Sequence, residues 1–389
     1  MNSPELIKAL SGRGNRMIGI DKLGCYVPKT VLPLTTLAHA RGVDPDKYTK
    51  GIGQVEMAII SPNEDVVTMA VEAAHTILDD ADKAAIDMVL FATETGLDYS
   101  KAAAIYAIDC LGLPQSTRAL ELKQACYAST GAMFLAMDYV RAHPTKKVLV
   151  LSSDIAWYGF ENAGEVTQGA GAIAMLISHN PRLGVISEGL KTVRNEKDFY
   201  RPLFSKVPLV DGKLSIECYT DMLKEVEDRQ PHLYTCFHLP FANMAKKANS
   251  VLTYPMDETH LNVVKELGSV VGNIYNGSLY LSLLSVLMHA KEDLTHQTLG
   301  MFAYGSGAMA EYFTITLQEN YTQGINLDSL KAITEERHRL TMDEYKVMMT
   351  HYENKEYASE IDLSDTIQAH QTYVLSSIGN GHRNYKKVK

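Results

Sequence analysis

The feature that most constrains the fold is a repeat within the chain. Residues Gly169–Ala174 read GAGAIA and residues Gly305–Ala310 read GSGAMA, so both follow the pattern G-x-G-A-x-A. A second match precedes each of them in the same order, because CYASTGAMFLAMDYV from Cys126 resembles NIYNGSLYLSLLSVL from Asn273. Each longer stretch has a polar residue, a tyrosine and a glycine before an apolar helix. Two matches in one order indicate two similar halves that pack as a pair.

Strand-like and helix-like stretches alternate along the first half. Residues 63–82 have a cap at Asn63 and apolar residues at helical spacing. Residues 86–93 form a short apolar run that is typical of a strand buried on both faces. We then expect a helix near 100–111, a strand at 118–123, a helix at 127–142 and a strand at 146–154. This alternation predicts an α/β fold with a mostly parallel sheet.

We expect the chain to have four parts. Residues 1–16 precede the first strand-like run, which begins at Met17, and form an N-terminal extension. Residues 17–180 form the first half and residues 231–389 the second half. Residues 181–230 have no recognisable counterpart in the first half, so we interpret them as an insertion.

The composition excludes several classes of protein. The 389 residues carry a formal charge of −9 without a basic stripe, which argues against a general nucleic-acid binder. No apolar stretch reaches the ~18 residues of a membrane span, and the N-terminus lacks the apolar core of an export signal. Five scattered cysteines without C-x-x-C spacing indicate free thiols, and neither a disulfide framework nor a zinc site. We therefore expect a cytoplasmic protein.

Cys126 lies where the predicted strand ends and the predicted helix begins. A single cysteine is usually a small buried apolar residue. At a helix N-terminus, however, the helix dipole and the unpaired N–H groups favour a thiolate. The small residues Ala125, Ala128, Ser129 and Gly131 would also let a ligand approach closely. From these residues alone, a core position and a catalytic nucleophile remain equally good interpretations.

Three other groups of polar residues have a structural and a functional interpretation. Glu94 ends an apolar strand, where it is a solvated carboxylate or a general acid/base at the ligand-binding edge of the sheet. His238 follows an apolar run and is a core histidine or a substrate contact. Lys246 and Lys247 form a solvated face or bind a phosphate. The G-x-G-A-x-A glycines fit close packing of strands better than a dinucleotide motif.

Eight motifs in order resemble a known family. They are ATETGLD, LKQACYAST, VTQGAGAIAM, KDFYRP, PLVDGKLS, CFHLPF, GNIYNGSLY and AYGSGAMAE. Together they resemble 3-hydroxy-3-methylglutaryl-CoA (HMG-CoA) synthases of bacterial type, within the thiolase superfamily. The resemblance runs from about Met17 to the C-terminus. It implies a duplicated α/β fold with five layers, α-β-α-β-α, and a homodimer.

The resemblance also implies an activity. Acetyl-CoA would transfer its acetyl group to Cys126, condensation with acetoacetyl-CoA would follow, and hydrolysis would release HMG-CoA and free CoA. This is a reaction of the mevalonate pathway to isoprenoids. The resemblance implies that neither a metal nor an organic cofactor takes part.

Residue roles follow from matching the motifs. Glu94 would be the general acid/base that forms the acetyl carbanion, and His238 would orient acetoacetyl-CoA. The residues implied to bind substrate or to support its pocket are Asp154, Thr167, Asp198, Lys247, Asn273 and Ser306. Among these, Asn273 and Ser306 would hydrogen-bond the acyl oxygens, and Lys247 would meet the CoA phosphates.

The chain departs from the family pattern near these residues. Gln124 stands where Glu commonly precedes ACY, and Val166 replaces the Pro of GGEPT, whose first Gly is Ala163 here. Asn243 stands where a second lysine is expected, and Asn276 replaces a usual Thr. These changes bear on affinity and rate more than on the type of reaction.

Three other functions compete with this one. A β-ketoacyl carrier-protein synthase III-like enzyme would place a His and an Asn around its cysteine, which His238 and Asn273 could imitate, but it would not need Glu94. A biosynthetic thiolase would carry a second catalytic cysteine near its C-terminus, whereas the last cysteine here is Cys236. A binding protein without activity would have no reason to keep all three reactive groups.

Overall fold

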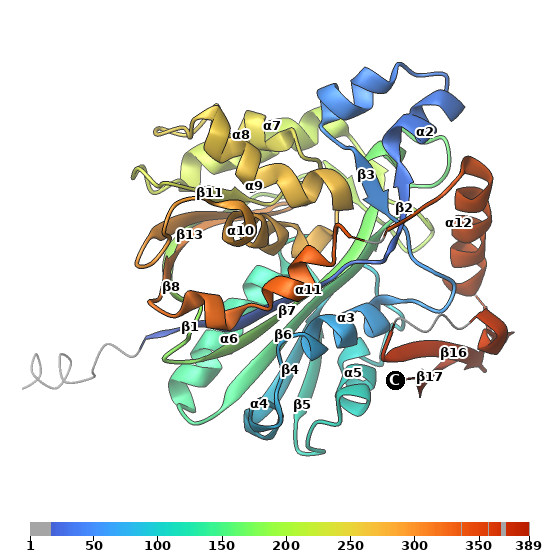
Figure 1. Cartoon of the computed structure of the whole chain (residues 1–389), viewed down its shortest axis with the longest axis horizontal. Helices are drawn as coiled ribbons and strands as arrows, with labels where there is room; N and C mark the ends of the chain where they lie inside the picture. Colours follow the sequence, from blue (N-terminus) through green and yellow to red (C-terminus); the bar gives the residue numbers. More distant parts are fainter. Residues whose placement is uncertain (1–16, 336, 357, 367–370, 389) are drawn as a thin grey trace, which may run out of the picture.

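The computed structural model describes residues 17–335, 337–356, 358–366 and 371–388. The expected extension, 1–16, lies outside the described residues. Within them the largest sheet has nine strands in the order β11 (Thr235–Phe237), β12 (Thr298–Gly305), β13 (Met309–Leu317), β8 (Gly184–Val193), β1 (Ile18–Tyr26), β7 (Gly169–His179), β6 (Lys147–Ala156), β4 (Ile86–Ala92) and β5 (Arg118–Leu122). The sheet forms the centre of the molecule (Figure 1).

The sheet contains the same arrangement twice. In the first half β7 is antiparallel to both neighbours, β1 and β6, and β6 is parallel to β4. In the second half β13 is antiparallel to β8 and β12, and β12 is parallel to β11. The two G-x-G-A-x-A segments lie in β7 and at the β12–β13 turn. The described strands of the second half include no counterpart of β5.

The range 181–230 is built differently from our expectation. It contains β8, which takes the place in the second half that β1 has in the first. It also contains α7 (Gly212–Val226), which packs on β8 and β13 as α3 (Val66–His75) packs on β1 and β7. The part without a counterpart is therefore the segment between β8 and α7, where β9 (Phe199–Tyr200) pairs with β10 (Leu209–Val210). The other domain bounds stay a prediction.

Helices cover the sheet and fill the space between its halves. On one outer side lie α3 and α5 (Ala103–Leu111), and on the other lie α7, α8 (Met244–Asn249) and α9 (Glu258–Val271) (Figure 1). Two further helices, α6 (Ala128–Ala142) and α10 (Ser278–His289), share one apolar core with side chains from both halves. In β6 the side chains of Val148 and Val150 face this core, whereas Leu149 and Leu151 face the core under α3 and α5. This period of two is what a strand buried on both faces requires.

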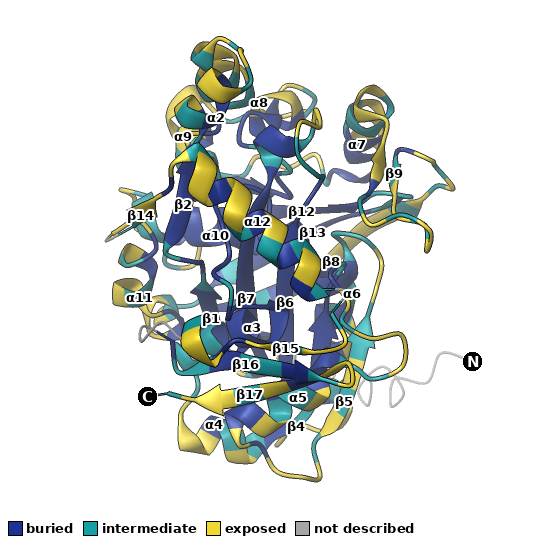
Figure 2. Ribbon diagram, turned by 90° about the vertical axis from the view of Figure 1, so that its right-hand side faces the viewer, coloured by how far each residue is buried: buried dark blue, intermediate teal, exposed yellow. Residues whose placement is uncertain are grey.

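Smaller elements complete the fold. They are β2 (Thr30–Pro33), α2 (Leu34–Ala40), a π-helix (Lys47–Ile52), β3 (Glu56–Ala58), α4 (Asp80–Ala85), α11 (Leu327–Lys331), β14 (His338–Arg339), α12 (Met342–Glu356), β15 (Ile361–Asp362), β16 (Tyr373–Gly379) and β17 (His382–Lys387), with short 3₁₀ turns at 165–167, 275–277, 321–324 and 364–366. Figure 2 shows α12 crossing the surface above β15–β17 with one exposed face. No helix among the described residues is both long enough and apolar enough to span a bilayer.

The expected helix over 63–82 is two helices, α3 and α4. The cap of α3 is Asp65 rather than Asn63, because the Asp65 side chain accepts hydrogen bonds from the N–H groups of Val67 and Thr68, both at 3.0 Å. Asp79 caps α4 in the same way. Acidic caps satisfy N–H groups that have no partner within the helix.

Candidate active site

Cys126 lies in a tight turn between β5 and α6. The turn needs a left-handed residue, Ala125, whose φ is 42°. Gly305 of the second half packs directly on this turn, because a Cβ atom there would lie 2.6 Å from the nitrogen of Tyr127 and 2.7 Å from the carbonyl oxygen of Gln124. A larger residue at 305 would push the cysteine turn away, so the glycine of the repeat has a direct role in placing the thiol.

The same construction recurs in the other half. Tyr275 has φ of 43° and stands three residues before the start of α10, as Ala125 stands three residues before the start of α6. A Cβ on Gly169 would lie 2.7 Å from the carbonyl oxygen of Asn273. Each repeat glycine therefore packs on the helix-start turn of the opposite half. In this structural alignment Asn276 takes the place of Cys126. The sequence comparison had aligned Cys126 with Asn273, three positions earlier.

Glu94 follows β4 and faces the cysteine turn. Its Oε1 accepts a hydrogen bond from Cys126 Sγ at 2.9 Å. Its backbone N–H donates to Asp154 Oδ1 at 2.7 Å, and Thr93 Oγ1 donates to the same oxygen at 2.9 Å. Thr95 adds a backbone and a hydroxyl donor to this oxygen, each at 3.1 Å. The carboxylate of Asp154 therefore fixes the loop that carries Glu94.

Asp154 also holds the opposite half. Its second oxygen, Oδ2, accepts from the backbone N of Asn276 at 3.2 Å and from Asn276 Nδ2 at 3.0 Å. Asn276 Oδ1 in turn accepts from the N–H of Ser129 at 3.0 Å. Asp154 is fully buried and both its oxygens are occupied by hydrogen bonds, so it holds Glu94 and Asn276 in place. The departure at 276 thus places an amide that bridges Asp154 and α6.

The electrostatic setting keeps the thiol protonated. Burial first, and then the Asp154 carboxylate, raise the pKa of Glu94 to about 8. Burial and the Glu94 carboxylate raise the pKa of the Cys126 thiol well above its ordinary value. We expected the helix N-terminus to favour a thiolate, but in the free protein burial and neighbouring carboxylates outweigh it. The carboxyl group in hydrogen-bond contact with the thiol is that of Glu94.

His238 follows β11 and is buried. The backbone N–H of His238 donates to the carbonyl of Phe302 at 2.9 Å, and the backbone carbonyl of His238 accepts from the hydroxyl of Tyr219 at 2.8 Å. Its Nδ1 has no hydrogen-bond partner among the described residues. Burial lowers the pKa of His238 to about 3, so the imidazole is neutral at physiological pH. A neutral imidazole can donate one hydrogen bond to a carbonyl oxygen.

Asn273 and Thr167 come together near the start of α10. The side-chain oxygen of Asn273 accepts from the N–H of Tyr275 and from the hydroxyl of Ser278, both at 2.9 Å. The Asn273 side chain also shares a hydrogen bond with the hydroxyl of Tyr158, and the two N–H groups of its amide nitrogen allow a second donation to a ligand. The N–H of Asn273 donates to the carbonyl of Thr167 at 3.2 Å, and the Thr167 hydroxyl donates to the carbonyl of Gly164 at 2.8 Å. Thr167 thus holds Asn273 through its backbone.

Ser306 lies in the β12–β13 turn, which Asp198 holds. The fully buried Asp198 accepts from the hydroxyl of Tyr304 and from the N–H of Gly307, both at 2.9 Å. The Gln124 side chain donates to the carbonyl of Ser306 at 3.4 Å. Asp198 thus accepts hydrogen bonds from both sides of Ser306, and the departure at 124 provides an amide donor to the same turn.

Lys247 lies on α8 with an exposed side chain, in contrast to the other predicted site residues. Asn243, at the start of α8, donates through Nδ2 to the carbonyls of Lys50 and Gly51 at 2.7 and 3.0 Å. Its Oδ1 accepts from Lys265 Nζ of α9 at 3.1 Å. The lysine that the family pattern predicts at position 243 is absent, but the amine of Lys265 lies beside Asn243.

Several residues near the thiol had no assigned role in our reading of the sequence. Tyr158 and Tyr275 form an aromatic cluster with Phe199, with ring centroids 6.0–6.3 Å apart, and Cys126 packs against this cluster. Arg201 donates a hydrogen bond to the carbonyl oxygen of Glu94. Phe199 and Arg201 belong to the KDFYRP motif, but only their place in the fold shows what they contact.

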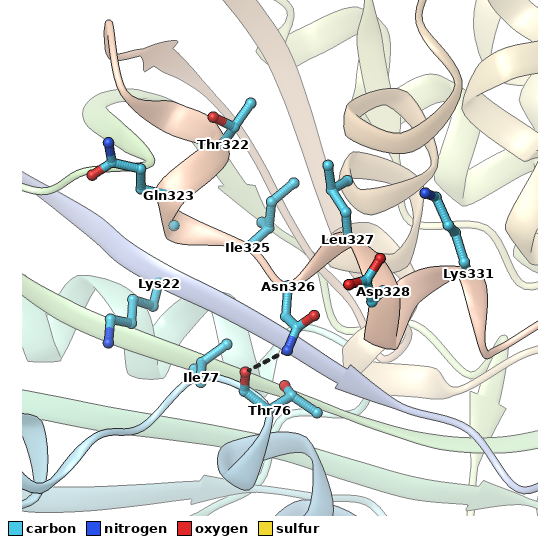
Figure 3. A pocket seen from close by; sticks show the side chains of 11 residues that line it. Lys22, Thr76, Ile77, Thr322, Gln323, Ile325, Asn326, Leu327, Asp328 and Lys331 are labelled. Carbon is cyan, nitrogen blue, oxygen red and sulfur yellow. Dashed lines mark hydrogen bonds between the residues drawn. The ribbon is translucent and has the colours of Figure 1, made fainter.

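Two hollows lie outside the cluster of predicted residues. A groove of about 590 Å³ lies behind the cysteine turn, lined in part by Gln124, Tyr127 and Val193. Another, of about 550 Å³, lies between β1 and the segment before α11 (Figure 3), where Asn326 donates to the carbonyl of Thr76. No predicted site residue lines this second hollow. Among the described residues no group of His, Cys, Asp and Glu side chains is arranged to hold a metal ion.

Two protein-family models match the chain. The model for the hydroxymethylglutaryl-coenzyme A synthase N terminal matches residues 15–182, and the model for the C terminal of the same family matches residues 258–389. The chain belongs to the HMG-CoA synthase family. The HMG-CoA synthase of Enterococcus faecalis is 38% identical over 388 residues, which cover 95% of this chain and 99% of that protein.

Solved structures of HMG-CoA synthases share the fold. One, complexed with CoA, has a TM-score of 0.86 at 36% identity and covers 96% of this chain and 100% of its own. Another, MvaS in complex with 3-hydroxy-3-methylglutaryl coenzyme A, has a TM-score of 0.85 at 30% identity with the same coverage. These matches confirm the family resemblance and the predicted thiolase-like α/β fold. The expectation of a mostly parallel sheet was wrong, because β7 and β13 each run antiparallel to both neighbours and β1 runs antiparallel to β8.

Proposed function

We propose that the protein condenses acetyl-CoA with acetoacetyl-CoA and water to give HMG-CoA and free CoA. The observation that carries the proposal is the partly buried hydrogen bond from the Cys126 thiol to the Glu94 carboxyl, beside Tyr275 of the second half. A thioester substrate suits a sulfur nucleophile, and a carboxyl with its pKa near 8 can both take and return a proton. Family membership supports the choice of substrates.

In the first step Cys126 accepts the acetyl group. The sulfur attacks the thioester carbonyl of acetyl-CoA while ionised Glu94 takes the thiol proton. The carbon–sulfur bond to CoA then breaks, and the departing CoA sulfur receives that proton. The products are acetyl-Cys126, free CoA and ionised Glu94, so the carboxyl is ready to act again.

In the second step a carbon–carbon bond forms. Glu94 takes a proton from the acetyl methyl group, and the resulting carbanion adds to the ketone carbon of acetoacetyl-CoA. Neutral His238 donates a hydrogen bond to the ketone oxygen, where negative charge develops. Protonated Glu94 then gives its proton to the new tertiary alkoxide. Asn273, through Nδ2, and Ser306 would hydrogen-bond the acyl oxygens.

In the third step water releases the product. Ionised Glu94 takes a proton from the water that attacks the thioester at Cys126, and the bond to sulfur breaks. The sulfur regains a proton, and the HMG-CoA that leaves retains the CoA of the second substrate. One side chain thus serves all three steps because its proton returns at each.

The CoA phosphates would meet lysines of α8 and α9. Lys246 and Lys247 are exposed, and no carboxylate forms an ion pair with either among the described residues. Lys265 brings a third amine beside Asn243. Free ammonium groups that lie close together attract phosphates.

Product analysis tests the proposed function. Isotope-labelled acetyl-CoA should label Cys126, and addition of acetoacetyl-CoA should release labelled HMG-CoA and discharge the cysteine. The competing β-ketoacyl synthase activity would require malonyl carrier protein in place of acetoacetyl-CoA. The assignment would be overturned if the enzyme condensed the acetyl group with malonyl carrier protein but not with acetoacetyl-CoA. It would also be overturned if Cys126→Ser turned over at the wild-type rate.

We also propose a homodimer formed across β5, α6 and β8. These elements lie along the same side of the molecule in Figure 2, and they carry the exposed apolar residues Leu120, Leu135, Leu190 and Val193, each at least 55% exposed. Arg118 of β5 donates to Tyr139 of α6 at 2.6 Å, which joins two parts of this surface. In addition β5 is an edge strand with unpaired backbone groups, and such strands readily pair with a second copy.

Light scattering tests the dimer. The Val193→Lys variant should shift the mass from dimer toward monomer. Val347, on α12 and 70% exposed, gives the matched control, since Val347→Lys lies away from this surface and should leave the mass unchanged. A wild-type protein that is monomeric at micromolar concentration would contradict the proposal.

A further inference from the structure

The segment between β8 and α7 joins three parts of the active site. Its Asp198 holds the turn of Ser306, and its Phe199 packs on Tyr158 and Tyr275. Its Arg201 reaches the backbone of Glu94. The segment is itself held as a hairpin by the β9–β10 pairing and by the N–H of Asp211, which donates to the carbonyl of Asp198 at 2.8 Å. We call residues 198–211 the active-site hairpin.

Glu94 is held from both sides of its backbone. On one side its N–H donates to the buried carboxylate of Asp154 at 2.7 Å. On the other side its carbonyl accepts from the guanidinium of Arg201. The two contacts bring opposite charges to the same residue. Because an arginine is always charged and its donors form a rigid fork, it can fix a carbonyl in one orientation.

The titratable groups that face Glu94 come from both halves of the fold. Cys126 and Asp154 face it from the α6 turn and β6, and the Glu94 carboxylate in turn raises the pKa of Tyr158 and of Tyr275, which are first raised by burial. Arg201 is the cation that faces it among the described residues, and its charge lowers the pKa of Glu94 against burial and Asp154.

We propose that Arg201 is a positioning residue that holds Glu94 toward Cys126 and supplies the positive charge that opposes Asp154. This inference rests on the proposed function for its role in turnover. It makes the active-site hairpin part of the catalytic apparatus, since the hairpin carries the arginine that contacts Glu94. Arg201 is exposed, so solvent screens its charge and the expected effect is moderate.

The test compares Arg201→Gln and Arg201→Lys by two measurements. The first is the pH dependence of kcat/KM, and the second is the pH dependence of Cys126 alkylation by iodoacetamide without substrate. In Arg201→Gln the Glu94–Cys126 pair should keep its protons to higher pH. Both midpoints should therefore move up by about 0.5 pH unit. Arg201→Lys keeps the charge and should stay near the wild-type midpoints.

Lys213→Gln provides the control for loss of a positive charge near the hairpin, because Lys213 is exposed and pairs with Glu217 of its own helix. Unchanged midpoints in Arg201→Gln, or an equal shift in Lys213→Gln, would overturn the proposal. If Arg201→Gln unfolds at low temperature, wild-type-like midpoints in Arg201→Met, which keeps much of the side-chain volume, would overturn it equally. If the wild-type protein makes no HMG-CoA, the proposed function fails, but the alkylation experiment still decides the role of Arg201.

Discussion

The thiol of Cys126 donates a hydrogen bond to the carboxyl oxygen of Glu94 at 2.9 Å, across the junction of β4 and α6. Burial raises the pKa of both groups; the Glu94 carboxylate raises that of the thiol further, whereas the hydrogen bond from the thiol lowers that of Glu94. The two therefore titrate as a coupled pair, and a kinetic experiment reports values that belong to the pair. A base that holds its proton until mildly alkaline pH is suited to return it within one catalytic cycle.

The first prediction concerns the pH dependence of turnover. Ionised Glu94 is needed to accept the thiol proton, so kcat/KM should rise with pH and approach its plateau above pH 8, where the pKa of Glu94 lies. Steady-state kinetics between pH 6 and 9.5 measure this limb. A plateau that is already reached at pH 6 would contradict a role for Glu94 with a raised pKa.

The second prediction concerns Glu94→Gln. The amide can still hydrogen-bond the thiol, but it can neither take nor return a proton. We expect condensation to fall by about 10³-fold, within the range typical for loss of a general acid/base. Acetylation should fall less, because solvent can accept the proton of the thiol. Rapid quenching with labelled acetyl-CoA separates the two steps, and a loss confined to acetylation would contradict the role of Glu94 in condensation.

Stability should change with pH in the direction opposite to activity. The pKa of Glu94 is raised from 4.5 in the unfolded chain to about 8 in the folded protein, so the folded state holds this proton more tightly. Its contribution to stability is complete below pH 4.5 and is lost as the pH rises toward 8. Relative to wild type, Glu94→Gln should therefore gain stability between pH 5 and pH 8.5. Thermal unfolding at both pH values measures the gain, and an unchanged difference in Tm would contradict it.

The fourth prediction concerns Asp154. Asp154→Ala leaves the donors of Glu94, Thr95 and Asn276 unpaired in a buried place, and it should cost about 3 kcal/mol of stability. Asp154→Asn keeps the volume but removes the negative charge, so the pKa of Glu94 should fall and the limb in kcat/KM should move to lower pH. A limb that does not move would mean that Asp154 acts on Glu94 through geometry alone.

The sequence predicted the fold class because its signals are local. The repeated G-x-G-A-x-A segments and the alternation of apolar runs can be read without knowing any contact. The sequence comparison aligned Cys126 with Asn273, three residues before its structural counterpart Asn276, because residue types alone align one polar residue with another. The structure aligns the left-handed residues Ala125 and Tyr275, whose backbone geometry no letter pattern reveals.

The contacts that finish the site could not be read from the chain. Asp154 joins residues 60 positions before it and 122 positions after it, and this pairing exists only once both halves have folded. The thiolate expected for Cys126 assumed a helix dipole acting alone. The true balance depends on the 2.9 Å contact with Glu94, since a neighbouring carboxylate disfavours a second negative charge.

The last prediction uses the repeat glycine that packs on the cysteine turn. A Cβ at Gly305 would lie 2.6 Å from the nitrogen of Tyr127, so Gly305→Ala must displace the turn that holds Cys126. A shift of about 1 Å in a reacting group costs about 100-fold in rate, and we expect a loss of that size in acetylation. Gly268→Ala is the matched control, because nothing lies within 4 Å of its would-be Cβ in α9. That change should preserve activity and add about 0.5–1 kcal/mol of stability. If Gly305→Ala acetylates Cys126 at the wild-type rate, the turn tolerates displacement and close packing of the repeat does not place the nucleophile.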